Sequence, residues 1–352
     1  MTRPRTGMAR MGQSSQSLTR REFVRSLAAS AFAAPVALGA PLAALAAPPV
    51  GAQAQTRPII KPKTLNHVGF FVSDVRRTAA WYQDLFGMPV QFRTDPGGTV
   101  AVLRIGAGPE FLALFPANGA KPGFSHMGFG VEGFSREAAD RALAAHNVSG
   151  EWRTRAASGG DVEELVIRDP DNLMIQVQDV RFSGGGGRLG DVWSQPWTTA
   201  PQSDRPRIQV RAVNHVTFGS SSKEGAERFY RDLFGLPLLS WDYRPGEPSK
   251  ILGVAVDAPR QFIAPGQGRA IGVSHYCLGV DGFDREAVAR VLTAHGMSVP
   301  PIGQERPGCC GSAIVYNPAE TVYGRDPDGF SVQFTDSNFC AGTGRLGTTC
   351  IV

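Results

Sequence analysis

The histidines of this chain recur in pairs at a nearly constant spacing. All six have a partner about 150 positions away, and the pairs are His67 with His215, His126 with His275, and His146 with His295. A regular spacing of this length indicates an internal duplication whose repeat has the size of a domain. Two similar domains in tandem are therefore expected.

Longer motifs repeat in the same order. Residues 65–68 (LNHV) correspond to 213–216 (VNHV), 81–89 (WYQDLFGMP) to 229–237 (FYRDLFGLP), and 168–171 (RDPD) to 325–328 (RDPD). The last pair is further apart than the others, so the second copy carries extra residues, which we expect near residues 307–311.

Residues 1–54 have the features of an export signal. The segment 19–25 (TRREFVR) resembles the bacterial twin-arginine signal, and an Ala-rich stretch follows over residues 26–47. A transmembrane helix is the competing interpretation, because this stretch approaches the ~20 residues that a span requires. Pro35, Pro41 and the excess of Ala over Leu or Ile favour a cleaved signal and a periplasmic protein.

The positive charge of the chain is concentrated in this segment. Six arginines and one glutamate lie within residues 1–54, which accounts for the whole formal net charge of +5. The remaining chain is formally neutral, so we expect neither nucleic-acid binding nor membrane binding after cleavage. Among the cysteines, Cys340 and Cys350 could close a small loop.

Each copy is expected to contain two β-α-β-β-β units. Apolar residues from Ala226 to Phe234 have the spacing of a core-facing helix, which Gly235 ends. Ser135 and Asp284 are expected to cap a further helix in each copy. We predict an α+β fold with four such units in two tandem open-barrel domains. The expected boundaries are 64–180 and 211–336 for the domains, 181–210 for a linker and 337–352 for a tail.

These motifs resemble the vicinal oxygen chelate superfamily. It includes glyoxalase I, the bleomycin and fosfomycin resistance proteins and the type I extradiol dioxygenases. The residues that carry the resemblance are 66–68, 81–89, His126 and 168–171, with their second-copy counterparts. The resemblance implies a glyoxalase-like fold in which paired units curl into an open barrel around a divalent metal ion.

The resemblance also implies a ligand set in each copy. Extradiol dioxygenases and fosfomycin resistance proteins use two histidines and one glutamate. The corresponding residues here are His67, His126 and Gln176 in the first copy, and His215, His275 and Gln333 in the second. Two histidines and one oxygen ligand leave coordination positions open for a substrate.

Both copies thus carry glutamine where the family usually has glutamate. An amide oxygen can bind a metal, but it lacks the charge that attracts M²⁺. Two interpretations stay open: either the glutamine is a ligand, or the metal is absent and the glutamine hydrogen-bonds an organic ligand. His146 and His295 are expected to be structural residues at helix C-termini.

The leading hypothesis is an exported enzyme that acts on a small-molecule substrate with adjacent oxygens. Its cofactor is expected to be a divalent metal ion, Fe or Mn first, with Zn, Ni or Co as further options. Dioxygenase, isomerase and lyase chemistry remain open. Tyr323 lies ten residues before Gln333, near where extradiol dioxygenases place a substrate-contacting tyrosine, and is the candidate catalytic residue.

The alternative is a metal-free protein that sequesters a small molecule, as bleomycin resistance proteins do. A monomer or homodimer is expected.

Overall fold

A computed structural model describes residues 57–93, 100–155, 162–184, 207–241, 249–254, 261–268, 270–297, 299, 320–342 and 345–349. They belong to one compact unit, residues 56–352. The predicted export signal, most of the predicted linker and the expected insertion near 307–311 lie outside the described residues. Within the described ranges, no helix is long and apolar enough to cross a membrane.

The first copy forms one mixed sheet of eight strands with two helices. Its elements are β1 (Pro62–Val72), α1 (Val75–Phe86), β2 (Val90–Arg93), β3 (Ala101–Arg104), β4 (Phe111–Pro116), β5 (Gly123–Val131), α2 (Arg136–His146), β6 (Gly150–Arg155), β7 (Val162–Arg168) and β8 (Met174–Asp179). The strand order is β2-β3-β4-β1-β5-β8-β7-β6, so the two β-α-β-β-β units meet where β1 and β5 run antiparallel.

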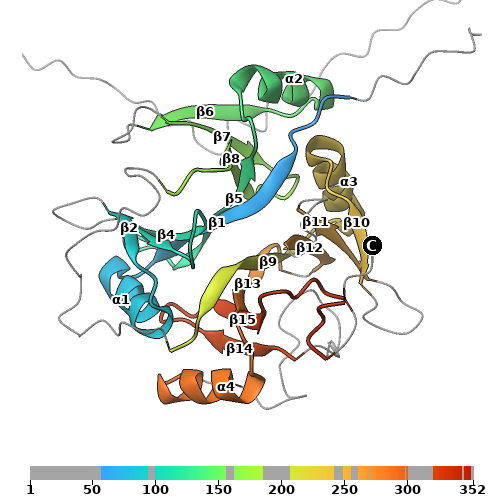
Figure 1. The fold of residues 1–352 in the computed structure, drawn as a ribbon. Helices are drawn as coiled ribbons and strands as arrows, with labels where there is room; N and C mark the ends of the chain where they lie inside the picture. Colours follow the sequence, from blue (N-terminus) through green and yellow to red (C-terminus); the bar gives the residue numbers. More distant parts are fainter. Residues whose placement is uncertain are drawn as a thin grey trace, which may run out of the picture. The chain divides into compact units, whose positions relative to one another are not determined.

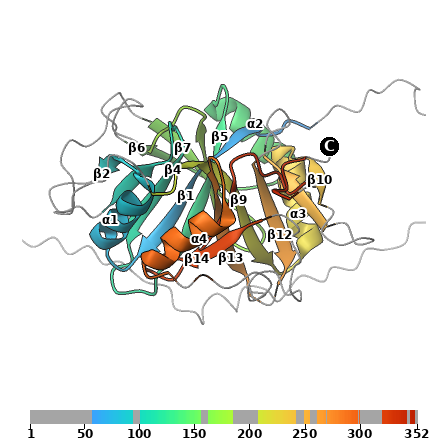
Figure 2. The ribbon, with the colours of Figure 1, turned by 60° about the horizontal axis from the view of Figure 1, so that its bottom comes forward.

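The second copy repeats this topology in a sheet of seven described strands. Its elements are β9 (Val210–Ser220), α3 (Lys223–Phe234), β10 (Leu238–Trp241), β11 (Ser249–Gly253), β12 (Phe262–Gln267), β13 (Gly272–Val280), α4 (Arg285–Ala294), β14 (Val322–Arg325) and β15 (Ser331–Asp336). The order is β10-β11-β12-β9-β13-β15-β14. The central strands β1 and β9 of the two sheets lie side by side (Figure 2). The predicted α+β fold with tandem glyoxalase-like sheets is confirmed.

The helix ends follow the expected capping chemistry. The side chains of Ser135 and Asp284 accept hydrogen bonds from the backbone N–H three residues later and begin α2 and α4. Gly87 and Gly235 adopt left-handed backbone conformations and end α1 and α3. The predicted caps Ser135 and Asp284 and the predicted helix end at Gly235 are therefore confirmed.

One hydrophobic core runs through both copies. Phe86 of α1 stacks on Phe334 of β15, with ring centroids 5.6 Å apart, and Phe129 of β5 meets the edge of Phe234 of α3 at 5.2 Å. The first helix of each copy lies beside strands of its own sheet (Figure 1) and also contacts the sheet of the other copy through one aromatic ring. Separating the copies would expose these rings to water, so we expect them to unfold together.

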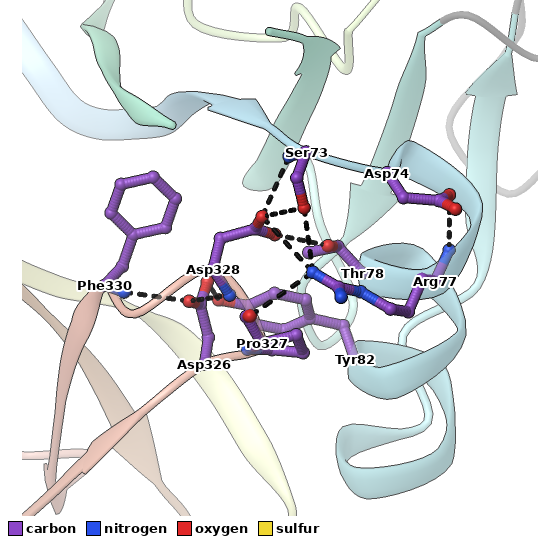
Figure 3. A network of polar contacts seen from close by, with 9 residues as sticks. All are labelled: Ser73, Asp74, Arg77, Thr78, Tyr82, Asp326, Pro327, Asp328 and Phe330. Carbon is purple, nitrogen blue, oxygen red and sulfur yellow. Dashed lines mark hydrogen bonds and ion pairs between the residues drawn. The ribbon is translucent and has the colours of Figure 1, made fainter. Parts of the chain in front are cut away.

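The aspartates of the repeated RDPD motif form hydrogen bonds between the two copies. In the second copy, Asp326 accepts hydrogen bonds from two backbone N–H groups of its own turn through Oδ1 and from the hydroxyl of Tyr82 in α1 through Oδ2, at 3.0 Å. Asp328 accepts from the N–H of Ser73 at 2.8 Å and from the hydroxyl of Thr78 at 2.6 Å (Figure 3). Its carboxylate thus lies at the N-terminus of α1, where a negative charge is favoured.

The first copy makes the reciprocal contacts. Asp169 accepts from the hydroxyl of Tyr230 in α3 at 3.0 Å, and Asp171 accepts from the N–H of Ser221 and the hydroxyl of Ser220 at the start of α3. The recurrence of the motif and of the helix tyrosine therefore has a structural cause.

A further pair of polar residues joins the central strands. Glu110 precedes β4 and Gln261 precedes β12, at equivalent positions of the two copies. The Gln261 side-chain amide donates to Glu110 Oε1 at 2.9 Å, and the Val213 N–H donates to Glu110 Oε2 at 2.6 Å. Gln261 Oε1 in turn accepts from the N–H of Leu65 at 2.9 Å.

Two of the cysteines are described individually. Cys277 is a free, buried thiol in β13, and Cys340 is disulfide-bonded to a partner outside the described residues. The pairing proposed for Cys340 with Cys350 therefore remains a prediction.

Candidate metal centre

The first-copy residues that the sequence singled out come together. His67 of β1, His126 of β5 and Gln176 of β8 lie on three neighbouring strands, and all three are buried. The Nε2 atoms of the two histidines are 3.0 Å apart, and Gln176 Oε1 is 3.3 Å from His67 Nε2. Three polar atoms thus converge on one point of the sheet.

Two glycines make room for these rings. Gly128 is paired with His67 and Gly69 with His126 across the β1–β5 ladder. A Cβ at Gly128 would lie 2.0 Å from the His67 ring, and a Cβ at Gly69 would lie 2.5 Å from the His126 ring. The ring positions therefore depend on the absence of side chains at both residues.

The hydrogen bonds around His67 determine which of its nitrogens carries a proton. Asn66 donates its Nδ2 to the carbonyl oxygen of Phe182 at 3.0 Å, so its Oδ1 faces His67 Nδ1 at 2.9 Å. Gln178 holds the same Oδ1 by donating to it at 3.1 Å. Oδ1 only accepts, so this shorter contact favours a proton on His67 Nδ1 and a lone pair on Nε2 toward the centre, whereas Gln178 Nε2, a donor 3.2 Å from Nδ1, favours the opposite tautomer.

The second copy repeats the arrangement on β9, β13 and β15. His215 Nε2 lies 3.3 Å from His275 Nε2 and 3.0 Å from Gln333 Oε1. Asn214 orients His215 as Asn66 orients His67, with Nδ1 2.7 Å from Oδ1. Burial, with a smaller contribution from His275, holds the pKa of His215 well below its usual range, so the ring is neutral near neutral pH.

His275 has its tautomer set by a different neighbour. The hydroxyl of Ser274 donates to the carbonyl oxygen of Thr217 at 3.0 Å and lies 3.4 Å from His275 Nδ1. Since the one hydroxyl proton is used, the serine oxygen faces Nδ1 as an acceptor. His275 therefore also turns a lone pair on Nε2 toward the centre.

The two copies differ in the residues that are paired with the histidines across the central ladder. The positions of Gly128 and Gly69 are taken by Cys277, which faces His215, and Thr217, which faces His275. The second copy thus tolerates side chains where the first requires glycine, and its Nε2 atoms are slightly further apart. Phe111 stacks on His67 and Phe262 on His215, each with centroids 4.3 Å apart.

The donor atoms fit a divalent metal ion. Ligand atoms bound to one metal at about 2.1 Å are separated by about 3.0 Å at right angles and about 3.4 Å in a tetrahedron. The separations of 3.0 and 3.3 Å in both copies fall in this range. In the second copy, the tautomers that Asn214 and Ser274 favour leave three acceptors facing one another without a donor, an arrangement that a cation stabilises. No cluster of three His, Cys, Asp or Glu occurs among the described residues, so each set depends on its amide oxygen.

Glu164 is a residue that the sequence reasoning missed. It lies on β7 with 4% of its surface exposed, and its Oε2 accepts a hydrogen bond from Gln176 Nε2 at 2.6 Å. The available signal was its position in an alternating strand two residues before Val166, which places it on the same face as Gln176.

Tyr323 lies next to the second set. It is paired with Gln333 across β14 and β15, and the edge of its ring meets His275 with centroids 5.5 Å apart. Val166 takes this position in the first copy. A catalytic role for Tyr323 remains a prediction.

His146 and His295 lie apart from both centres, at the ends of α2 and α4. His146 Nε2 is 3.0 Å from the carbonyl oxygen of Pro58, and His295 Nδ1 is 2.8 Å from that of Val291. The prediction that both are structural agrees with these contacts.

Apolar side chains line the sheet beside each histidine pair and are separate from the shared core. They are Val102, Phe111, Ala113 and Phe182 in the first copy, and Ile251, Phe262, Ala264, Phe339 and Ala341 in the second. Each centre thus combines a few polar atoms with an apolar wall, as small-molecule sites do.

Known proteins share this fold. Three similar solved structures are the 2,3-dioxygenase LapB from Pseudomonas sp. KL28 (TM-score 0.54, 15% identity, covering 79% of this chain and 92% of that one), a mutant of homoprotocatechuate 2,3-dioxygenase from Brevibacterium fuscum (0.56, 16%, 79% and 72%) and the Mn(II)-bound glyoxalase from Novosphingobium aromaticivorans (0.54, 17%, 81% and 85%). At these identities the likeness shows the fold alone. No curated protein matches the sequence.

A family model matches the first copy. Residues 64–177 match the Glyoxalase/Bleomycin resistance protein/Dioxygenase superfamily, the group that the sequence motifs resemble. The second copy has the same motifs in the same strands. The first copy thus belongs to this superfamily by sequence, and the second copy repeats its motifs and its fold in a second glyoxalase-like sheet.

Proposed function

We propose that this chain is a divalent-metal enzyme acting on a small substrate with two adjacent oxygen atoms. The observation that carries the proposal is the convergence, in each copy, of two imidazole Nε2 atoms and one amide Oε1. The similarity in fold to dioxygenases and a glyoxalase supports it. Fe or Mn is the first candidate for the metal, and Zn, Ni and Co are further options.

We assign each residue of the two centres a role in binding the metal ion. His67, His126 and Gln176 would hold the metal in the first copy, and His215, His275 and Gln333 in the second. When bound, such an ion supplies open positions for the adjacent substrate oxygens and makes their protons more acidic. Asn66 and Asn214 keep the histidine lone pairs directed at the centre.

The surroundings indicate what the rest of the substrate is like. Phe111 and Phe182 contact the His67 ring, and Phe262 and Phe339 contact the His215 ring. These side chains exclude water and favour an apolar or aromatic body beside the two oxygens. In the second copy, the Tyr323 hydroxyl would donate a hydrogen bond to a substrate oxygen. Dioxygenation, isomerisation and elimination all begin from this binding mode.

The proposal also covers the location and partners of the protein. We infer export to the periplasm by the twin-arginine route, from the motif at residues 19–25. A small molecule is the proposed partner, with no nucleic acid, no membrane contact after cleavage, and a monomeric or homodimeric state.

Metal content tests the proposal. Protein matured in cells should contain stoichiometric metal, and His67→Ala and His215→Ala should each lower the content or the affinity of one site. Absence of bound Fe, Mn, Zn, Ni and Co, before and after reconstitution, would contradict a metal enzyme. Turnover of catechol-type and α-hydroxy-carbonyl substrates would then be measured on the loaded protein.

A second function is favoured by one observation. Both ligand sets end in a neutral glutamine, which would also suit a hydrogen bond to an uncharged organic molecule. A metal-free protein that sequesters an apolar compound would bind that compound equally well in the presence of a chelator.

A further inference from the structure

In the first centre, the carboxylate of Glu164 contacts Gln176, one of the proposed metal ligands. Glu164 lies on the same face of β7 as Val166, which is paired with Gln176 on β8. Its Oε2 is 2.6 Å from Gln176 Nε2, and its side chain is nearly fully buried. The pair is therefore enclosed by protein, where electrostatic interactions are strong.

This contact determines how the Gln176 amide is turned. A carboxylate accepts hydrogen bonds and donates none, so the amide nitrogen must face Glu164. The carbonyl oxygen is then directed at His67 Nε2, where the structure places it at 3.3 Å. A neutral ligand that could otherwise rotate by half a turn is thereby held with its oxygen inward.

The second copy has no carboxylate at the position equivalent to Glu164. The residue two positions before Tyr323, equivalent to Glu164, is Thr321, which carries no charge. Gln333 Oε1 lies 3.0 Å from His215 Nε2, but no carboxylate at that position orients its amide. The two centres therefore differ in charge although their three proposed ligands are the same.

We propose that Glu164 is the positioning residue of the first centre and makes it the tighter of the two metal sites. It holds the Gln176 oxygen toward the metal and supplies, through one amide group, the negative charge that a glutamate ligand would have provided. The inference rests on the proposed function in one respect, that a metal binds, and goes beyond it by assigning the stronger site to the first copy.

Co²⁺ binding tests this inference on the full mature chain. His215→Ala would isolate the first centre and His67→Ala the second. We expect tighter Co²⁺ binding in the His215→Ala protein, a comparison that requires no change at Glu164. Tighter binding in the His67→Ala protein would overturn the inference.

Substitution of Glu164 then tests its role. In the His215→Ala background, Glu164→Gln should weaken Co²⁺ binding about 10- to 100-fold, the usual effect of removing a group that orients a ligand. In the His67→Ala background it should change nothing. The exchange Glu164→Gln with Gln176→Glu should restore binding and shift the Co²⁺ absorption bands, because the carboxylate then reaches the metal directly.

The outcomes separate the two proposals. If neither background binds Co²⁺, the proposed metal enzyme fails. If the first centre binds Co²⁺ equally well with and without Glu164→Gln, only the role of Glu164 is overturned. If Glu164→Gln alters binding equally in both backgrounds, the effect is a general loss of structure, and the positioning role is rejected.

Discussion

Gly128 lies opposite His67 across the β1–β5 ladder, and a Cβ at Gly128 would come within 2.0 Å of the histidine ring. We therefore predict that Gly128→Ala displaces His67 and weakens metal binding at the first centre at least ~10-fold. Gly123→Ala on the same strand is the matched control, because its Cβ would meet no atom closer than 3.9 Å. Equal Co²⁺ affinity in the two variants, measured in the His215→Ala background, would contradict this account.

Replacing the proposed ligand glutamine by glutamate should have a different main effect in each copy: tighter metal binding in the second, and a less stable metal-free protein in the first. Gln333→Glu places an anionic ligand beside His215 and should tighten Co²⁺ binding at the second centre. Gln176→Glu places a second carboxylate where the amide now donates to Glu164 at 2.6 Å, so two like charges would be buried together. We expect this variant to melt at a lower temperature without metal. Tm values with and without Co²⁺ measure both effects, and identical responses of the two variants would count against the difference in charge.

The features that repeat along the sequence were predictable from it. The duplication and the histidine pairs follow from the constant spacing of repeated motifs. The capping residues Ser135 and Asp284 follow from elementary capping chemistry. The proposed ligands could be named because the same residue types recur in both copies. That His67 and His126 meet at 3.0 Å also required the strand register, which β1 and β5 set together.

The contacts between the copies were not predictable in this way. Asp328 and Tyr82 were read only as family motifs, although each contacts the other copy. Glu164 was missed because it lies twelve residues before Gln176 and reaches it only through the pairing of β7 and β8. Its position in an alternating strand indicated the face of the sheet, but the sequence does not show which strand is paired with β7.

The contact of Asp328 with α1 should contribute substantially to stability. Asp328→Ala removes the acceptor for the Ser73 N–H and leaves the buried hydroxyl of Thr78 without it. We expect the free energy of unfolding to fall by about 2–4 kcal/mol. Asp179→Ala is the control, because its partner Arg181 is largely exposed and such a pair contributes about 0–1 kcal/mol. Urea denaturation of both variants would measure the difference, and equal losses would refute it.

The export proposal predicts where an altered protein accumulates. Exchange of both signal arginines, Arg20→Lys with Arg21→Lys, should leave the full-length precursor in the cytoplasm. The twin-arginine route requires that pair, and the substitutions keep the charge unchanged. Cell fractionation followed by mass determination would show this. Mature protein in the periplasm from the double variant would argue for another route.

The buried Glu110 should make stability depend on pH. Burial raises its pKa to about 8, against the opposing effect of the hydrogen bonds from Val213 and Gln261, whereas an exposed glutamate in the unfolded chain titrates near the usual ~4.3. Between these values the folded protein keeps a proton that the unfolded chain has lost. The contribution to stability is therefore fully present below pH ~4 and is lost as the pH rises through about 8, by up to about 5 kcal/mol. Glu110→Gln has no proton to lose, so its Tm should fall less between pH 5 and 8.5 than that of the wild-type protein. Asp326, whose pKa burial raises to about 6, titrates in both proteins and cancels in the difference. Parallel Tm curves for the two proteins would show that Glu110 is ionised in the folded state throughout this range.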